Sequence, residues 1–312
     1  MNIQKLTREE FAAWDDAAAI SPQAGLFHTT YWNQMLCETA GNNQTCKYIV
    51  CEKKGKILGG IALHSRGGKS NLPIFGYNGP FFHPEINYRE NQKTVPGYEV
   101  HTELLHEISS LTRQVHIRNQ PEIWNTRAYS FNKWQVRTNY THILDCSNKE
   151  DLWKKTSSPL SEKAREQQFI VADTTNDPTQ KSLPYIINLP AFGWKSSKSK
   201  FTKRVQWLKE QGLCRIIQLI QKNGEKLASA FFILSKENKT IYLHKSILPS
   251  NAAESEIFSL LIWHSYLSFG AGFEQIDLGT SNTMSMSRTK DSIGGKLTPF
   301  FVTTSKKYFF QS

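Results

Sequence analysis

The alternation of apolar and polar positions predicts the same β-hairpin twice along the chain. In the first half, the apolar runs at 48–51 and 57–63 flank a short polar turn. In the second half, the runs at 216–220 and 227–234 flank a turn that contains an Asn-Gly pair. Asn-Gly between apolar runs is a strong hairpin signal, because both central residues of that turn adopt positive φ. Two antiparallel hairpins are therefore expected, one in each half.

The elements around the two turns repeat as well. The turn glycines, Gly55 and Gly224, are 169 residues apart. Each hairpin follows a helical pattern with large apolar anchors and precedes a longer helical pattern and a short strand. We therefore expect a mixed α/β (α+β) fold of two tandem domains, each with a central, mainly antiparallel sheet flanked by helices. The repeated elements are the helices around 31–36 and 201–208, the helices 98–113 and 254–269, and the strands 115–117 and 275–278.

A change of pattern near residue 147 predicts the boundary between the two domains. The strand-like run Thr141–Asp145 closes the first half, and the polar residues Ser147–Asp151 then cap a new helix that contains Leu152. The expected domains are 1–147 and 148–312, and a chain of 312 residues is long enough for two ordinary cores.

The net positive charge of the chain has two possible interpretations. There are 38 Lys and Arg against 27 Asp and Glu, which gives a formal net charge of +11. One interpretation is a well solvated surface, and the other is a polyanionic partner such as nucleic acid, nucleotide phosphates or an anionic lipid face. The lysines are spread along the chain and form no single block, so the sequence favours neither.

The termini and the cysteines predict a reduced, cytoplasmic protein. The N-terminus lacks the apolar core of a signal peptide and runs directly into Thr7–Glu10, a capping box that opens a helix. The most apolar stretch, 257–273, is short and carries polar residues, which favours a buried helix over a membrane span. The five cysteines are odd in number and show no Cys-x-x-Cys spacing, so free thiols are expected.

Several familiar catalytic motifs are absent from the sequence. It contains no Gly-x-Ser-x-Gly elbow, no phosphate-binding Gly-x-x-x-x-Gly-Lys loop and no His-Glu-x-x-His. His101 and His106 are five residues apart, a poor spacing for two ligands on one helix face, and we expect no metal site.

The most informative constellation lies near the C-terminus. A strand-like run at 276–278 leads into the small and polar residues Gly279–Asn282, followed by Arg288 and Lys290. Small residues at a strand end allow a ligand to approach the backbone, while hydroxyl and amide groups orient it. An ordinary basic turn before the last strand is the alternative interpretation.

This segment resembles the end of the Fem-type peptidyltransferases and their relatives. The family's pattern is a strand ending in Asp, a Gly-Ser pair and Arg-Phe-Lys-x-x-Phe-Gly-Gly, and this chain has Asp-Leu-Gly-Thr-Ser-Asn at 277–282 and Arg-Thr-Lys-Asp-Ser-Ile-Gly-Gly at 288–295. The first half is similar at the helix start 27–32, the hairpin end 59–63 and the turn 77–82, so the resemblance covers nearly the whole chain. It implies two acetyltransferase-like (GNAT-type) domains in tandem, in agreement with the duplication.

The resemblance also implies acyl transfer to an amine. Members of the family transfer an amino acid from aminoacyl-tRNA to an amine on a cell-wall precursor, and relatives are acyltransferases. Lys290 falls on the family's functional lysine, which would neutralise charge on the tetrahedral intermediate or on donor phosphates, and Arg288 falls on its neighbouring arginine. Both are expected to be catalytic. The expected substrate-binding residues are Asp277, Ser281, Asn282, Tyr242, Lys163 and Arg165, of which the last two stand where relatives have an Arg-rich helix.

Three hypotheses about function follow. The first is an aminoacyl or acyl transferase that acts on an amine of a cell-envelope (peptidoglycan-type) precursor. Aminoacyl-tRNA is then the donor, no cofactor is tightly bound, and the basic surface allows peripheral contact with an anionic membrane. The second is a coenzyme A-dependent N-acyltransferase, which is less favoured because the segment 248–253 has no glycine-rich loop for a pyrophosphate. The third is a non-catalytic module that binds anionic lipid or RNA. A cleft beside Lys290 would favour an enzyme. If side chains fill this space, the non-catalytic module is favoured.

Overall fold

The chain folds into two compact units, each of which is described by itself. Unit 1 comprises Met1–Asn139 and Pro299–Ser312, and unit 2 comprises Tyr140–Thr298. Each unit has a central, mainly antiparallel sheet flanked by helices, which confirms the predicted mixed α+β class. The computed structural model describes residues 1–40, 44–70, 73, 75–86, 97–156, 169–173, 175, 198–222, 224, 226–248 and 254–305.

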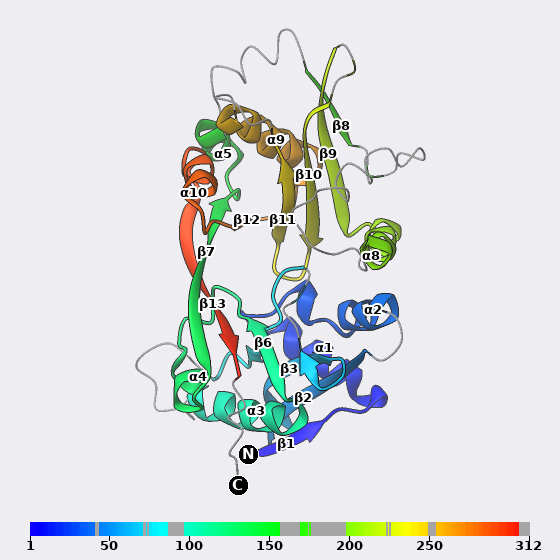
Figure 1. Ribbon diagram of the computed structural model, residues 1–312, viewed down its shortest axis with the longest axis vertical. Coiled ribbons are helices and arrows are strands. Elements are labelled where there is room, and N and C mark those ends of the chain that lie inside the picture. The colour runs from blue at the N-terminus through cyan, green and yellow to red at the C-terminus, as the bar shows by residue number, and fades with distance from the viewer. Residues whose placement is uncertain are drawn as a thin grey trace. The chain divides into compact units, whose positions relative to one another are not determined.

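Unit 1 is built on an antiparallel sheet with the strand order β1-β2-β3-β5, of which β1, β2 and β3 are labelled in Figure 1. In a second group of strands, β4 runs parallel to β6, and the end of β13 pairs antiparallel with β6. The strands are β1 (Asn2–Lys5), β2 (Thr45–Lys53), β3 (Lys56–Ser65), β4 (Lys69–Ser70), β5 (Phe81–Phe82), β6 (Gln114–Arg118) and β13 (Lys296–Thr304), which begins in unit 2. The helices are α1 (Phe11–Ala19), α2 (Thr30–Ala40), α3 (Gly97–Leu111) and α4 (Arg127–Phe131), with short 3-10 helices at Arg8–Glu10 and Leu26–His28.

The alternation of side chains along β2 explains how both faces of this sheet are covered. Ile49 and Cys51 point to one face and pack in a core with residues of α3. Tyr48 and Val50 point to the other face and pack with Trp14 of α1. Because β2 is buried on both faces, its sequence is a nearly continuous apolar run instead of a strict alternation.

Both predicted hairpins are confirmed. β2 pairs antiparallel with β3, and β9 (Cys214–Gln221) pairs antiparallel with β10 (Lys226–Ser235). Gly55 has φ +76° and Gly224 has φ +83°, the left-handed region that the tight turns require. The helix before each hairpin, α2 in the first copy and α8 (Lys198–Glu210) in the second, also follows the 169-residue offset to within a residue at each end.

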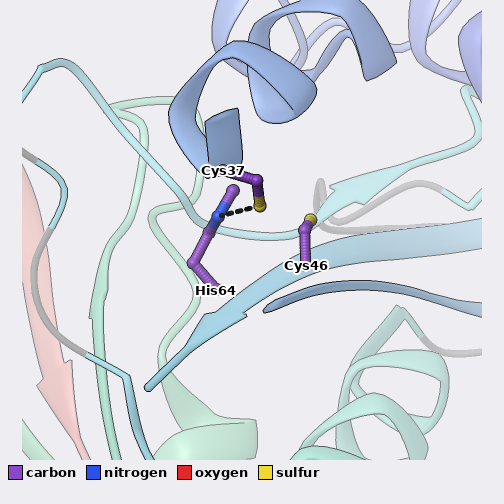
Figure 2. A group of neighbouring side chains, drawn as sticks. All are labelled: Cys37, Cys46 and His64. Atoms are coloured by element: carbon purple, nitrogen blue, oxygen red, sulfur yellow. Dashed lines mark hydrogen bonds between the residues drawn. The ribbon is translucent and has the colours of Figure 1, made fainter. Parts of the chain in front are cut away.

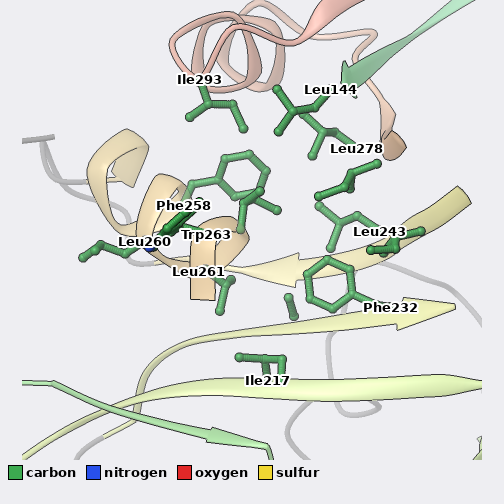
Figure 3. Close-up of a cluster of buried hydrophobic side chains, with 14 of the residues drawn as sticks. Leu144, Ile217, Phe232, Leu243, Phe258, Leu260, Leu261, Trp263, Leu278 and Ile293 are labelled. Carbon is green, nitrogen blue, oxygen red and sulfur yellow. The ribbon is translucent and has the colours of Figure 1, made fainter. Parts of the chain in front are cut away.

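Unit 2 contains a sheet with the order β7-β12-β11-β10-β9-β8, in which β11 and β12 run parallel and the other neighbours are antiparallel. The further strands are β7 (Gln135–Asp145), which begins in unit 1, β8 (Phe169–Asp173), β11 (Thr240–Ile247) and β12 (Gln275–Thr280). The further helices are α5 (Lys149–Thr156), α9 (Glu254–Phe269) and α10 (Met284–Asp291). Figure 3 shows the core of this unit, in which Phe258 and Leu261 of α9 pack against Phe232 and Leu243 of the sheet.

Other sequence expectations have definite outcomes. All five cysteines are free thiols, and three of them are buried. Within the described residues, every helix is too short or too polar to cross a bilayer. The capping box forms as expected, since the Thr7 backbone N–H donates to Glu10 Oε2 over 2.8 Å, but it opens a 3-10 turn before α1. Lys163, Arg165 and most of the segment 248–253 lie outside the described residues.

Candidate active site

The site begins at a bulge in β12. Gly279 has φ +74°, and the register between β12 and β7 shifts between Asp277 and Thr280. The buried Asp277 carboxylate accepts hydrogen bonds from the Gly279 N–H over 2.8 Å and from the Thr141 hydroxyl. A Cβ at Gly279 would lie 2.9 Å from the carbonyl oxygen of Leu243. Only glycine therefore fits this position without strain, and the bulge turns two backbone carbonyls toward α10.

Lys290 reaches these carbonyls from α10. Its ammonium donates to Gly279 O over 2.9 Å and to Thr280 O over 2.7 Å. The residue is only 8% exposed, and this burial lowers the pKa of Lys290 to about 8, while the charge of Asp277 acts in the opposite direction. An ammonium has three N–H groups, so one remains for a further acceptor. At neutral pH the site thus holds a desolvated positive charge with a donor to spare.

A pocket of about 180 Å³ lies beside this lysine. The parallel ladder between β11 and β12 covers only Thr240–Tyr242 with Gln275–Asp277, after which the two strands are no longer paired. The pocket opens where the pairing ends, between residues 243–246 of β11 and 278–280 of β12, and Lys290 forms part of its lining. Its apolar lining includes Leu243, Phe258 and Leu278, which Figure 3 shows as part of the core. This volume suits an acyl group better than a complete drug-sized ligand.

A polar network behind the pocket holds α10 against the sheet. His142 is fully buried on β7, with Nδ1 2.7 Å from Ser281 Oγ and Nε2 2.7 Å from Asp291 Oδ1. Asp291 also accepts a hydrogen bond from Ser287 over 3.2 Å. A hydroxyl, an imidazole and a carboxylate in series resemble an activated nucleophile, but Ser281 does not line the pocket. The network therefore fixes the position of α10, and with it that of Lys290.

The predicted site residues fall into two groups. Asp277, Ser281 and Lys290 come together, because each bonds to the backbone of Gly279. Asp277 accepts from its N–H, and Ser281 and Lys290 both donate to its carbonyl. Three others lie apart from the pocket lining. They are Asn282, which is exposed and accepts from the Tyr140 N–H over 3.1 Å, Tyr242, whose hydroxyl accepts from Asn238 over 2.8 Å, and Arg288, which is exposed on α10.

Helix geometry explains why Arg288 and Lys290 separate. Residues two positions apart lie on nearly opposite faces of an α-helix, so one of the pair faces the sheet and the other faces solvent. Sequence reasoning did not single out Thr141, His142 or Asp291 as site residues. His142 and Ser281 are 139 positions apart, and only the pairing of β7 with β12 brings them together.

No model of a protein family matches the sequence, and no curated protein is detectably similar to it. Among solved structures, a tandem GNAT protein from the clavulanic acid biosynthesis pathway has 10% identity and a TM-score of 0.62, with 97% of this chain and 98% of that chain covered. The structure of FemX has 12% identity and a TM-score of 0.62, with 96% and 97% covered.

A third structure agrees with these two. It is a GNAT-family acetyltransferase from Colwellia psychrerythraea, with 12% identity and a TM-score of 0.60, in which 98% of this chain and 100% of that chain are covered. At such low identity the similarity establishes the fold alone. The chain thus has a tandem GNAT fold over nearly its whole length, as the resemblance to the Fem-type family implied.

Proposed function

We propose that this protein is an acyltransferase that passes an aminoacyl group from aminoacyl-tRNA to an amine of a cell-envelope precursor. The observation that carries the proposal is the buried Lys290 ammonium, which lines the pocket and is held by two carbonyls with one N–H left over. A cation at the wall of a small pocket suits a reaction in which negative charge develops on an acyl oxygen.

The reaction replaces an ester bond with an amide bond and requires no bound cofactor. The acceptor nitrogen attacks the acyl carbon, a C–N bond forms, and the acyl oxygen gains negative charge in the tetrahedral intermediate. When this intermediate collapses, the ester C–O bond to the tRNA breaks, and the leaving ribose oxygen takes up the proton lost by the amine and becomes a hydroxyl. Lys290 would donate its third N–H to the oxyanion, and the apolar wall would exclude water from the ester.

The carrier of the acyl group has to lie largely outside a pocket of this size. The net charge of +11 supplies the attraction for a polyanionic carrier such as tRNA. Structures such as FemX share the fold, which supports this class of reaction without identifying the donor.

A coenzyme A-dependent N-acyltransferase is the second candidate, and one observation favours it. Beyond Tyr242 and Asp277, β11 and β12 are no longer paired with each other, and the pocket opens between the separated strands. The extended arm of a thioester donor could enter between them. A non-catalytic module is less well supported, because the space beside Lys290 is open.

Donor titrations distinguish these candidates. Binding of bulk aminoacyl-tRNA and of acyl-CoA is measured on the same protein over a range of salt concentrations, followed by transfer of labelled acyl groups to peptidoglycan-type precursor amines. For tRNA, the slope of log K against log salt should be about −0.7 for each phosphate neutralised on a single strand, so several contacts give a steep dependence. Saturable acyl-CoA binding without tRNA binding at low salt would reject the leading proposal, and binding of neither would favour the non-catalytic module.

A further inference from the structure

Unit 1 brings two thiols and an imidazole together, whereas the pocket described above belongs to unit 2. Cys46 on β2 and His64 on β3 are direct partners in the antiparallel ladder, so their side chains leave the sheet on the same face. Cys37 on α2 points at them from above (Figure 2). The two Sγ atoms and a ring nitrogen of His64 all lie within 4.8 Å of one another. All three residues are partly exposed, so the cluster is accessible from solvent.

The imidazole of His64 is held in one orientation by Asn33. The Asn33 amide group donates to the carbonyls of Thr29 over 2.8 Å and of Phe27 over 3.3 Å, which leaves its Oδ1 facing the ring. Oδ1 lies 2.6 Å from His64 Nε2, so that nitrogen carries the proton. The lone pair of Nδ1 therefore points toward Cys37 Sγ, 3.7 Å away. A metal-binding histidine is usually oriented in this way, with its second ring nitrogen donating to an oxygen.

The three side chains present converging electron-pair donors, which are two sulfur atoms and one imidazole nitrogen. Cysteine sulfur and histidine nitrogen are the ligands that Zn²⁺ takes most often in proteins.

We propose that Cys37, Cys46 and His64 bind one Zn²⁺ ion. Tetrahedral zinc with bonds of about 2.3 Å to sulfur and 2.0–2.1 Å to nitrogen requires separations of about 3.6 Å between sulfur and nitrogen and about 3.8 Å between two sulfurs. The separation of 3.7 Å between Cys37 Sγ and His64 Nδ1 is close to the first of these values. The two separations that involve Cys46 Sγ need only a small movement, since neither exceeds 4.8 Å. The amide of Gln44, 3.4 Å from His64 Nδ1, would move aside, and a water molecule would complete the coordination.

The duplication supplies an internal comparison. The positions 169 residues further along the chain hold Gln206, Arg215 and Ile233, none of which provides the same ligands. The second copy therefore forms its helix and hairpin without such a cluster. Thiolate and imidazole ligands select zinc over magnesium or calcium, and in a reducing compartment clustered cysteines indicate metal binding more often than disulfides. The ion would join α2 to the β2–β3 hairpin and so stabilise unit 1.

The test measures metal binding by the full chain. Protein reduced and stripped of metal is titrated with Co²⁺ as a spectroscopic probe and with Zn²⁺ against a chromophoric chelator. We expect one ion per chain, a sulfur-to-cobalt charge-transfer band, the strong visible bands of tetrahedral Co²⁺, and a higher melting temperature with Zn²⁺. Cys37→Ser, Cys46→Ser and His64→Gln should each weaken binding at least about tenfold, as should the loss of the Asn33 oxygen in Asn33→Ala.

Matched variants separate this site from other thiols and imidazoles. Cys51→Ala removes a fully buried thiol on β2, the strand that carries Cys46. His106→Gln removes an exposed histidine of unit 1. Both variants should bind the ions as the wild type does. No Co²⁺ charge-transfer band, or binding unchanged in Cys37→Ser and His64→Gln, would overturn the proposal. A Cys37–Cys46 disulfide in the purified protein, with no metal binding after reduction, would also overturn it.

Discussion

Replacement of Lys290 by methionine is the most direct test of the candidate active site. Methionine keeps a long, unbranched side chain and removes the charge. Loss of a single oxyanion donor lowers turnover by about 10²- to 10³-fold in well studied enzymes, which corresponds to about 2.7–4 kcal/mol. We expect kcat/KM of K290M to fall by at least about 10²-fold at pH 7 in the transfer assay.

The pH dependence of this effect gives a sharper signature. A pKa of about 8 means that Lys290 is charged in about 90% of molecules at pH 7 and in about 10% at pH 9. The advantage of the wild type over K290M should therefore shrink about tenfold between these two pH values. Taking the ratio of the two enzymes cancels the ionisation of the acceptor amine, which is the same in both.

The control is Lys296→Met, which removes an exposed lysine of unit 2. Its ratio to the wild type should stay near one at every pH. The melting temperature of K290M should differ little from that of the wild type, since it loses two hydrogen bonds but also a costly desolvated charge. A ratio that does not change between pH 7 and 9, or full activity in K290M, would refute the role given to Lys290.

Two further variants probe the surroundings of this lysine. In Gly279→Ala the new Cβ lies 2.9 Å from Leu243 O at φ +74°, whereas in Gly272→Ala it meets nothing within 4 Å at φ +88°. In urea denaturation, Gly279→Ala should lower the free energy of unfolding by about 1 kcal/mol or more beyond the effect of Gly272→Ala. Equal effects of the two substitutions would contradict the close contact. Asp277→Asn removes the charge that raises the pKa of Lys290. The pKa of Lys290 should therefore fall, and the alkaline loss of activity should have its midpoint below pH 8 in this variant. An unchanged midpoint would show that Asp277 does not act on Lys290.

The fold was predictable from the sequence because its signals are local. Each hairpin is specified by two apolar runs and a turn with Gly55 or Gly224, and repetition at a fixed offset indicates two similar units. The candidate site was only partly predictable. The segment from β12 to α10 supplied Asp277, Ser281 and Lys290, all within 14 residues of one another. Thr141 and His142 come from β7, and which strand lies beside β12 is not encoded in any local pattern.

The cluster of Cys37, Cys46 and His64 was also only partly predictable from the sequence. The turn of the hairpin lies between Lys53 and Lys56, and this pairing alone would place Cys46 opposite Leu63. A bulge between Cys51 and Glu52 shifts the register by one residue, so His64 is the partner of Cys46. The sequence thus predicts the hairpin but not the pairing of these two proposed ligands. The position of Cys37 depends on how α2 packs on the sheet, and the side chain that orients His64 lies on the same helix, one turn earlier, at Asn33. A helix that provides both a ligand and the group orienting another ligand couples metal binding to the packing of α2, and for this reason zinc should raise the melting temperature through unit 1.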